Sequence, residues 1–238
     1  MAGGLRRLVA EALGTASLLA AIVGSGIVVG PGGGGTALFQ HAVVVGLALV
    51  ALILAFGPVS GAHLNPVVSL ADAWFGGISW SRAGGYIGAQ VLGAVAGVAF
   101  TNLTFGRPLV EVATTLRSGP ALVASEVLAT AGLIVVIFGL VRSGAGRVVA
   151  AGVGAYIAAA IVFTASTSFA NPAVTIARTL SDTYTGIVPA SVPGFLLGQG
   201  LGLGLAIVLV RVLYDPDPAE ARAVVIPRAG PRPVDEPA

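Results

Sequence analysis

The chain has 238 residues, of which 56% are hydrophobic and only 9% are charged, so it has too few polar groups to cover a soluble globular protein of this size. Its formal charge of +2 is too small and too dispersed for a nucleic-acid-binding surface. Cysteine is absent, which excludes disulfides and thiolate metal sites.

Six apolar stretches are long enough to cross a bilayer, which takes about 20 residues of helix. In chain order they span residues 6–29, 37–58, 84–104, 121–141, 148–166 and 188–213. Two further apolar segments, 65–75 and 171–180, are too short to cross at about 1.5 Å per residue. The sequence therefore predicts an all-α membrane protein with six transmembrane helices and two re-entrant half-helices.

The two halves of the chain repeat one another. AEALGT at residues 10–15 matches SEVLAT at 125–130, and NPVV at 65–68 matches NPAV at 171–174. Each half has three spans, an odd number, so the second copy enters the membrane from the opposite face and the repeats are inverted. We expect one domain over residues 1–213, with repeats at about 5–104 and 120–213, and a disordered cytoplasmic tail over 214–238.

The distribution of arginine predicts the orientation. If six helices alternate, nine arginines lie on the side of both termini and two, Arg107 and Arg117, lie on the other. Because cytoplasmic loops carry an excess of positive residues, both termini are expected in the cytoplasm, with the chain in the inner or plasma membrane.

Each short segment begins with an asparagine followed by a proline, Asn65-Pro66 and Asn171-Pro172. Asparagine is a favoured helix N-cap, and proline is tolerated at the first helical position because its missing N–H would have no partner there. The pairs therefore predict two helix N-termini that face each other inside the bilayer. Their positive dipole ends would repel cations, and the asparagine amides would remain available to a passing solute.

Titratable residues inside the predicted spans have a structural and a functional interpretation. Glu11 and Glu126 occupy equivalent positions in the two repeats, at a depth where a carboxylate is costly. We expect each to accept hydrogen bonds from backbone N–H groups of a re-entrant segment; the alternative is a proton relay or an ion site. His63 is expected to anchor its own loop, the alternative being a pH gate. His41 is expected only at the membrane interface.

The run SGAHLNP at residues 60–66, together with FANPA at 169–173, is similar to the paired signature of the aquaporin and glycerol-facilitator family. The resemblance covers residues 5–213 and implies a channel domain with a pore in each subunit, usually assembled as a homotetramer. It implies a pore motif made of Asn65, Pro66, Val67, Asn171, Pro172 and Ala173. No nucleophile with a base and no metal-ligand cluster appears at usable spacing, so neither an enzyme nor a cofactor is expected.

The chain departs from this family where solutes are selected. In most members an arginine directly follows the second motif and narrows the outer mouth, whereas this chain has Val174. Carrying over the other filter positions by spacing gives a filter of Val45, Ala159, Ser168 and Val174, which would be wide, apolar and uncharged. Arg178 is expected to make a contact near the end of the short helix; the alternative is that it leans back and replaces the missing charge.

The pattern over residues 169–182 is similar to a bacterial subgroup associated with arsenic-resistance operons. This resemblance implies passage of arsenite and methylated arsenicals. We therefore expect a passive channel for uncharged solutes, including glycerol-like polyols, metalloids and water. Two alternatives stay open: a water-selective aquaporin, and a coupled secondary transporter, a class that also uses inverted repeats and broken helices.

Overall fold

The computed structural model describes residues 2–30 and 34–214, and within them the chain is all-α. Six long helices are α1 (Ala2–Val29), α2 (Gly34–Ser60), α4 (Trp80–Thr104), α5 (Pro120–Arg142), α6 (Val149–Phe163) and α8 (Val192–Leu213). Each is long and apolar enough to cross a membrane. For α6 and α8 the span includes the short 3-10 turn that precedes the helix, Gly146–Val148 and Pro189–Ser191. Two short helices, α3 (Pro66–Trp74) and α7 (Pro172–Ala177), each begin at the proline of an Asn-Pro pair. The predicted fold class is confirmed.

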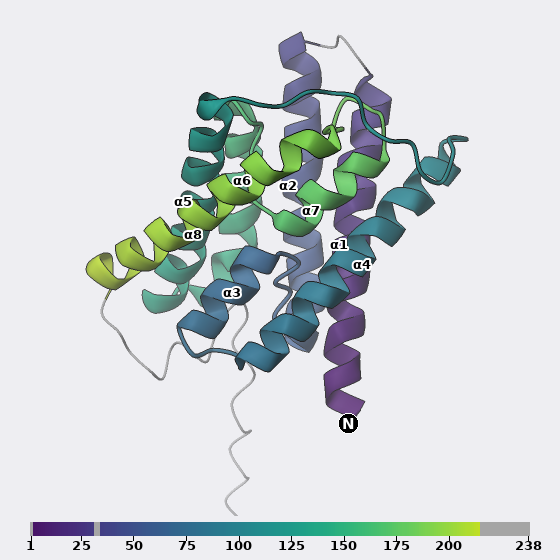
Figure 1. The fold of residues 1–238 in the computed structure, drawn as a ribbon. Helices are drawn as coiled ribbons and strands as arrows, with labels where there is room; N and C mark the ends of the chain where they lie inside the picture. Colours follow the sequence, from purple (N-terminus) through teal and green to yellow (C-terminus); the bar gives the residue numbers. More distant parts are fainter. Residues whose placement is uncertain (1, 31–33, 215–238) are drawn as a thin grey trace, which may run out of the picture.

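The helices form a bundle in which the two halves of the chain pack in equivalent ways (Figure 1). In the first half α1 packs along α4, and in the second half α5 packs along α8. The two short helices lie within the bundle, and they contact each other as well as the long helices around them. The expected tail lies outside the described residues except for Tyr214.

Repeat-related glycines allow the closest of these helix contacts. A Cβ atom on Gly93 of α4 would lie 2.1 Å from the carbonyl oxygen of Ala12 in α1, and one on Gly202 of α8 would lie 2.7 Å from that of Val127 in α5. Neither distance leaves room for a methyl group. Without a hydrophobic drive between helices in lipid, such small residues bring backbones into van der Waals contact, so these glycines determine how tightly each half packs.

An extended segment over residues 105–119 connects α4 to α5 across one side of the bundle (Figure 1). We call this the loop side; the N-terminus lies on the opposite side, the N-terminal side. The segment pairs with the residues that follow α7: the N–H groups of Glu111 and Ala113 donate to the carbonyls of Leu180 and Thr179 at 3.0 and 2.9 Å. The end of α7 is therefore held from the loop side.

Candidate pore and selectivity filter

Both asparagines cap the helices that they precede. Asn65 has extended backbone, φ −158° and ψ 123°, and its Oδ1 accepts from the N–H of Val67 at 3.0 Å. Asn171 has φ −156° and ψ 112°, and its Oδ1 accepts from Ala173 at 3.0 Å and Val174 at 3.2 Å. The carbonyl oxygen of each side chain thus satisfies N–H groups that have no partner inside the helix, leaving the amide nitrogen for other contacts.

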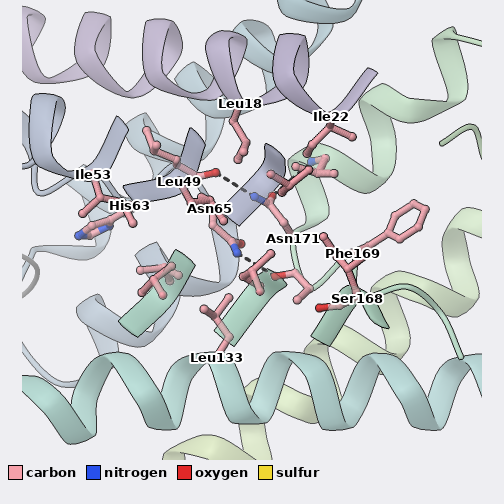
Figure 2. Close-up of a pocket in the computed structure, with 18 of the residues that line it drawn as sticks. Leu18, Ile22, Leu49, Ile53, His63, Asn65, Leu133, Ser168, Phe169 and Asn171 are labelled. Atoms are coloured by element: carbon pink, nitrogen blue, oxygen red, sulfur yellow. Dashed lines mark hydrogen bonds between the residues drawn. The ribbon is translucent and has the colours of Figure 1, made fainter. Parts of the chain in front are cut away.

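Each amide nitrogen reaches across to the other half of the chain. Asn65 Nδ2 donates to the carbonyl of Ala170 at 2.8 Å, and Asn171 Nδ2 donates to the carbonyl of Leu64 at 2.9 Å (Figure 2). The acceptors are the residues directly before each asparagine. An amide nitrogen carries two hydrogens, so each asparagine retains one for a solute. Both side chains border one cavity inside the bundle.

Two buried glutamates hold the non-helical segments that lead to the asparagines. Glu11 accepts from the N–H groups of His63 at 3.0 Å and Leu64 at 2.7 Å. Glu126 accepts from Phe169 and Ala170, both at 2.9 Å. The expected hydrogen bonds from these carboxylates to the re-entrant backbone are therefore present in both halves.

A glutamine completes each of these clusters in the same way. Gln90 Nε2 donates to Glu11 at 2.8 Å and to the hydroxyl of Ser69 at 3.0 Å. Gln199 Nε2 donates to Glu126 at 2.7 Å and to the hydroxyl of Thr175 at 2.8 Å. Each glutamine therefore ties the carboxylate to the first turn of the short helix, so that loop and helix are positioned together.

The held segments contain non-glycine residues with left-handed backbone. Ala62 and Leu64 in the first half have φ values of 47° and 50°, and Ser168 and Ala170 in the second half have 47° and 46°. Such conformations are uncommon for residues with a Cβ and persist only where the surroundings impose them. The glutamate hydrogen bonds supply that constraint, and the carbonyls of Leu64 and Ala170 accept from the asparagine of the other repeat instead of closing helical hydrogen bonds.

His63 is fixed by two side chains of α3. Its Nδ1 lies 3.1 Å from Ser69 Oγ, and its Nε2 lies 3.3 Å from Asp72 Oδ2. Its ring also makes an edge contact with Tyr86, with ring centroids 5.2 Å apart. His63 is thus an anchor of its own loop while also bordering the cavity. Asp72 was missed by the sequence reasoning, although a lone carboxylate in a short apolar segment is a usable signal.

The cavity runs between the two repeats, with His63 near one end and Ser168 and Phe169 near the other (Figure 2). Most of its wall is apolar and comes from α1, α2, α5 and α6. The polar side chains that border it are His41, His63, Asn65, Thr167, Ser168, Asn171 and Arg178. Pro66, Val67, Pro172 and Ala173 are not among the lining residues; they build the first turns of the short helices, and Val68 borders the cavity instead of Val67.

The structure brings three of the four expected filter residues to this cavity. Val45, Ser168 and Val174 line it, whereas Ala159 lies on the exposed face of α6. Ile157 and Ile161 are the residues of α6 that reach the cavity near that height. The transfer by spacing fails here because each residue turns a helix by about 100°, so a small difference in the connection from α6 to Asn171 moves a position to another face.

Arg178 also lines the cavity, one helical turn along the chain from Val174, so a charged side chain stands near the expected uncharged filter. Its side chain is only 4% exposed, its guanidinium carbon lies 3.5 Å from the centre of the Phe169 ring, and its Nε donates to the carbonyl of Thr185. Arg117 approaches the same ring, at 5.5 Å. Among the described residues no carboxylate oxygen lies within 4 Å of either arginine. The loop side of the cavity is therefore positively charged.

His41 is buried at the same end of the cavity, whereas the sequence led us to expect only a position at the membrane interface. It is 4% exposed and borders the cavity, and its Nδ1 lies 2.8 Å from Ser25 Oγ. Position along the helix alone gave the expectation. The structure shows that α2 begins at Gly34, so His41 lies two turns inside it.

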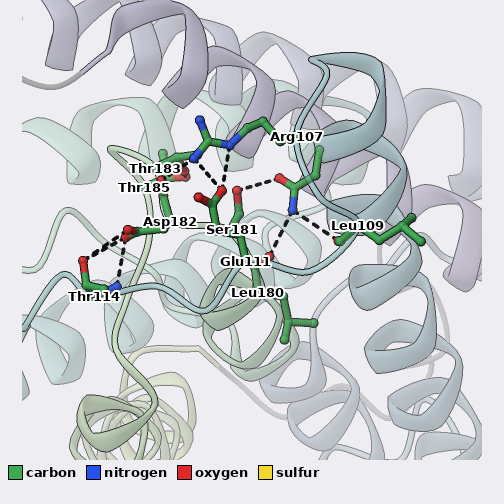
Figure 3. Close-up of polar contacts among 10 residues, drawn as sticks. Arg107, Leu109, Glu111, Thr114, Leu180, Ser181, Asp182, Thr183 and Thr185 are labelled. Atoms are coloured by element: carbon green, nitrogen blue, oxygen red, sulfur yellow. Dashed lines mark hydrogen bonds and ion pairs between the residues drawn. The ribbon is translucent and has the colours of Figure 1, made fainter.

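The residues after α7 are braced by a polar network (Figure 3). Arg107 donates to the carbonyl of Asp182 at 2.8 Å, and the Asp182 carboxylate accepts from the N–H of Thr114 at 2.9 Å. Asn102 Nδ2 donates to the carbonyl of Leu180 at 3.0 Å and its Oδ1 accepts from Ser181 at 2.7 Å. Asn102 of α4 and the segment over 105–119 thereby hold the residues on either side of the turn between Arg178 and its acceptor Thr185.

Comparison with known proteins identifies the family of this chain. The family model described as major intrinsic protein matches residues 2–165. This chain belongs to the major intrinsic protein family. It is 44% identical over 196 residues to the aquaglyceroporin AqpS of Rhizobium meliloti (strain 1021), covering 82% of this chain and 84% of that one. It is 33% identical over 190 residues to aquaporin NIP1-3 of Oryza sativa subsp. japonica, covering 76% and 66%.

A solved structure shares the fold. The chain matches the X-ray structure of the aquaglyceroporin from Plasmodium falciparum with a TM-score of 0.69 and 20% identity, covering 87% of this chain and 94% of that one. As a major intrinsic protein with six apolar helices, this chain is a multi-pass membrane protein. It is a passive channel for small solutes and not an enzyme.

Proposed function

We propose that this channel conducts small uncharged solutes that carry hydroxyl groups, namely glycerol-like polyols, arsenite and methylated arsenicals, together with water. The observation that carries the proposal is the pairing of Asn65 and Asn171, each of which offers a free amide hydrogen to a cavity whose wall is otherwise mostly apolar. A polyol or a trihydroxide can place its oxygens against the amides of Asn65 and Asn171 and its apolar side against the apolar part of the wall.

The charge on the solute is limited by the two short helices. The N-termini of α3 and α7 meet at the asparagines, so the positive ends of two helix dipoles converge at one point of the cavity. This arrangement repels protons and other cations, whereas a neutral solute experiences no such barrier. At neutral pH arsenite is an uncharged trihydroxide of about the shape of glycerol, so both belong to the admitted class.

The solute's size is limited by the filter. Val174 replaces the arginine that most members carry at this position, and we propose that it forms the filter with Val45, Ser168 and, in place of Ala159, Ile161. These side chains leave more width than an arginine at position 174 would. AqpS, which is 44% identical over most of its length, is named an aquaglyceroporin, in agreement with a channel wider than water needs.

The assembly and orientation that we propose are those expected from the sequence. We propose one channel domain over residues 1–213, inserted in the inner or plasma membrane with both termini in the cytoplasm, because the arginines concentrate on the N-terminal side. The loop side then faces outward. A homotetramer with one pore per subunit is the proposed assembly.

Stopped-flow permeability of the purified protein in liposomes tests this function. Water, glycerol and arsenite are compared in the same vesicles, with a proton-flux measurement alongside and protein-free vesicles as the control. Rapid passage of glycerol and arsenite without protons supports the proposal. Passage of water alone would overturn it.

A water-selective aquaporin is the second candidate, and Arg178 is the observation that favours it. Its guanidinium borders the cavity and supplies a charge that could narrow the mouth, as the usual filter arginine does. The same liposome experiment separates the two candidates, because the water-selective channel would exclude glycerol.

A further inference from the structure

Three polar side chains at the loop side of the cavity have hydrogen-bonding groups that have no partner among the described residues. Arg178, Ser168 and His41 all border the cavity and are 4%, 5% and 4% exposed. Such groups are costly to bury without a partner, and most buried polar atoms in proteins are paired. Their coincidence at one end of a solute path indicates that the partner is the solute.

Arg178 contributes donors. Its Nε is occupied by the carbonyl of Thr185, but within the described residues its two terminal nitrogens have no hydrogen-bond acceptor and no carboxylate. The guanidinium lies against the ring of Phe169, and Phe195 makes an edge contact with that ring at 4.8 Å. The donor plane is therefore held still, which lowers the entropy lost when a solute binds.

Ser168 contributes a hydroxyl. Its Oγ is buried and has no hydrogen-bond partner in the described part of the chain, although its backbone N–H is bound by Ser166 Oγ at 3.2 Å. The residue has left-handed backbone, with φ 47°. A hydroxyl both donates and accepts hydrogen bonds, so this group can donate to a solute oxygen or accept from a solute hydroxyl.

His41 contributes an acceptor, and its partner determines which nitrogen that is. Ser25 Oγ lies 2.6 Å from the carbonyl oxygen of Ala21, 3.2 Å from that of Ile22 and 2.8 Å from His41 Nδ1. We assign its single hydrogen to the shortest contact, that with Ala21, which leaves His41 Nδ1 to donate to the hydroxyl oxygen. A neutral imidazole with hydrogen on Nδ1 has a lone pair on Nε2. Among the described residues no group donates to that nitrogen.

We propose that Arg178, Ser168 and His41 form a solute-binding site at the loop-side mouth, specific for small neutral solutes that carry two or more hydroxyl groups. The site offers fixed donors from Arg178, one acceptor from His41 and the hydroxyl of Ser168, which can do either. This combination matches solute hydroxyl groups, each of which both accepts and donates hydrogen bonds. This site rests on the proposed function as a solute channel and adds a specificity determinant one helical turn beyond Val174.

The decisive variant is Ser168→Ala, because that hydroxyl makes no hydrogen bond to any residue that the structure describes, and its removal should leave folding intact. Thr130→Val is the matched control: within residues 2–30 and 34–214, Thr130 Oγ1 is also buried without a partner, but the residue does not border the cavity. His41→Phe, which keeps a ring against Tyr184, tests the acceptor separately. Water and glycerol permeability are measured in liposomes for each variant and for the unaltered chain.

The expected result is that Ser168→Ala and His41→Phe each lower the glycerol-to-water permeability ratio about five-fold, the effect of one lost hydrogen bond of about 1 kcal/mol. Thr130→Val should leave the ratio unchanged. An unchanged ratio in Ser168→Ala and His41→Phe, or an equal change in Thr130→Val, overturns the site. If the unaltered chain passes no glycerol, the proposed function fails instead, and the two failures are thereby distinguished.

Discussion

The side-chain amides of Asn65 and Asn171 each donate to the carbonyl that directly precedes the other asparagine, at 2.8 and 2.9 Å. The two residues therefore form a reciprocal link between repeats that are more than a hundred positions apart in the chain. Each one also caps its own short helix. One side-chain type performs three tasks at this point: it caps a helix, joins the repeats and faces the solute.

Replacing Asn171 by aspartate should raise the proton and cation permeability of the channel. The cap is kept because aspartate is also a good N-cap, but the donor to Leu64 is lost and a negative charge is placed between two positive helix ends. Proton flux into vesicles under an imposed potential is the measurement. Asn102→Asp is the control, since Asn102 bonds two carbonyls but lies away from the cavity. Equal leakage of both variants would contradict the proposed cation barrier.

Val174→Arg should narrow the mouth and reduce permeability to large solutes. We expect glycerol permeability to fall about ten-fold while that of water changes little, because the new side chain must occupy the cavity that Val174 now borders. Val174→Leu adds volume without charge and should have a smaller effect. Unchanged passage of glycerol through Val174→Arg would show that position 174 does not belong to the filter.

Glu126→Gln should destabilise the second re-entrant segment. The Glu126 carboxylate accepts from two backbone N–H groups and from Gln199, and an amide in its place turns one acceptor into a donor that faces donors. The expected loss is about 2 kcal/mol, measured as a lower unfolding temperature in detergent.

Glu111→Gln provides the comparison for Glu126→Gln. Glu111 pairs with Arg107 at a partly exposed site, where an ion pair contributes about 1 kcal/mol or less. If both variants unfold at the same temperature, the loop does not depend on Glu126.

Gly202→Ala should weaken the packing of α8 on α5. The added methyl group would meet the carbonyl of Val127, so the helices must separate, at a cost of about 1–3 kcal/mol. Gly204→Ala, where no atom lies within 4 Å of the added carbon, should be neutral or slightly stabilising. Unfolding temperature and size-exclusion profile in detergent report the difference; identical profiles would argue against glycine-mediated packing.

Much of the fold was predictable because its determinants are local. Helix length follows from runs of apolar residues, and the starts of α3 and α7 follow from the capping chemistry of Asn-Pro. The hydrogen bonds of Glu11 and Glu126 were predictable from their equivalent positions in a repeat.

The mouth was less predictable because its geometry depends on distant segments. Ala159 turned out to lie on the exposed face of α6, since rotation about a helix axis is sensitive to a single residue of connection. Arg178 points into the cavity because its turn is held by residues 105–119, and no spacing rule within its own repeat encodes that brace. The apolar surroundings of His41 and Arg178 in the sequence were a better signal than spacing, because ionisable groups are costly to bury in a membrane and those present are usually functional.

The reciprocal asparagine link also bears on how the channel is made. The first repeat emerges from synthesis before the second, and on its own it supplies only one capped half-helix and one part of the cavity wall. Neither Asn65 nor Leu64 then has its partner from the other half. A conducting path arises only when the second repeat docks, so a half-made chain in the bilayer has no completed pore through which the cell could leak.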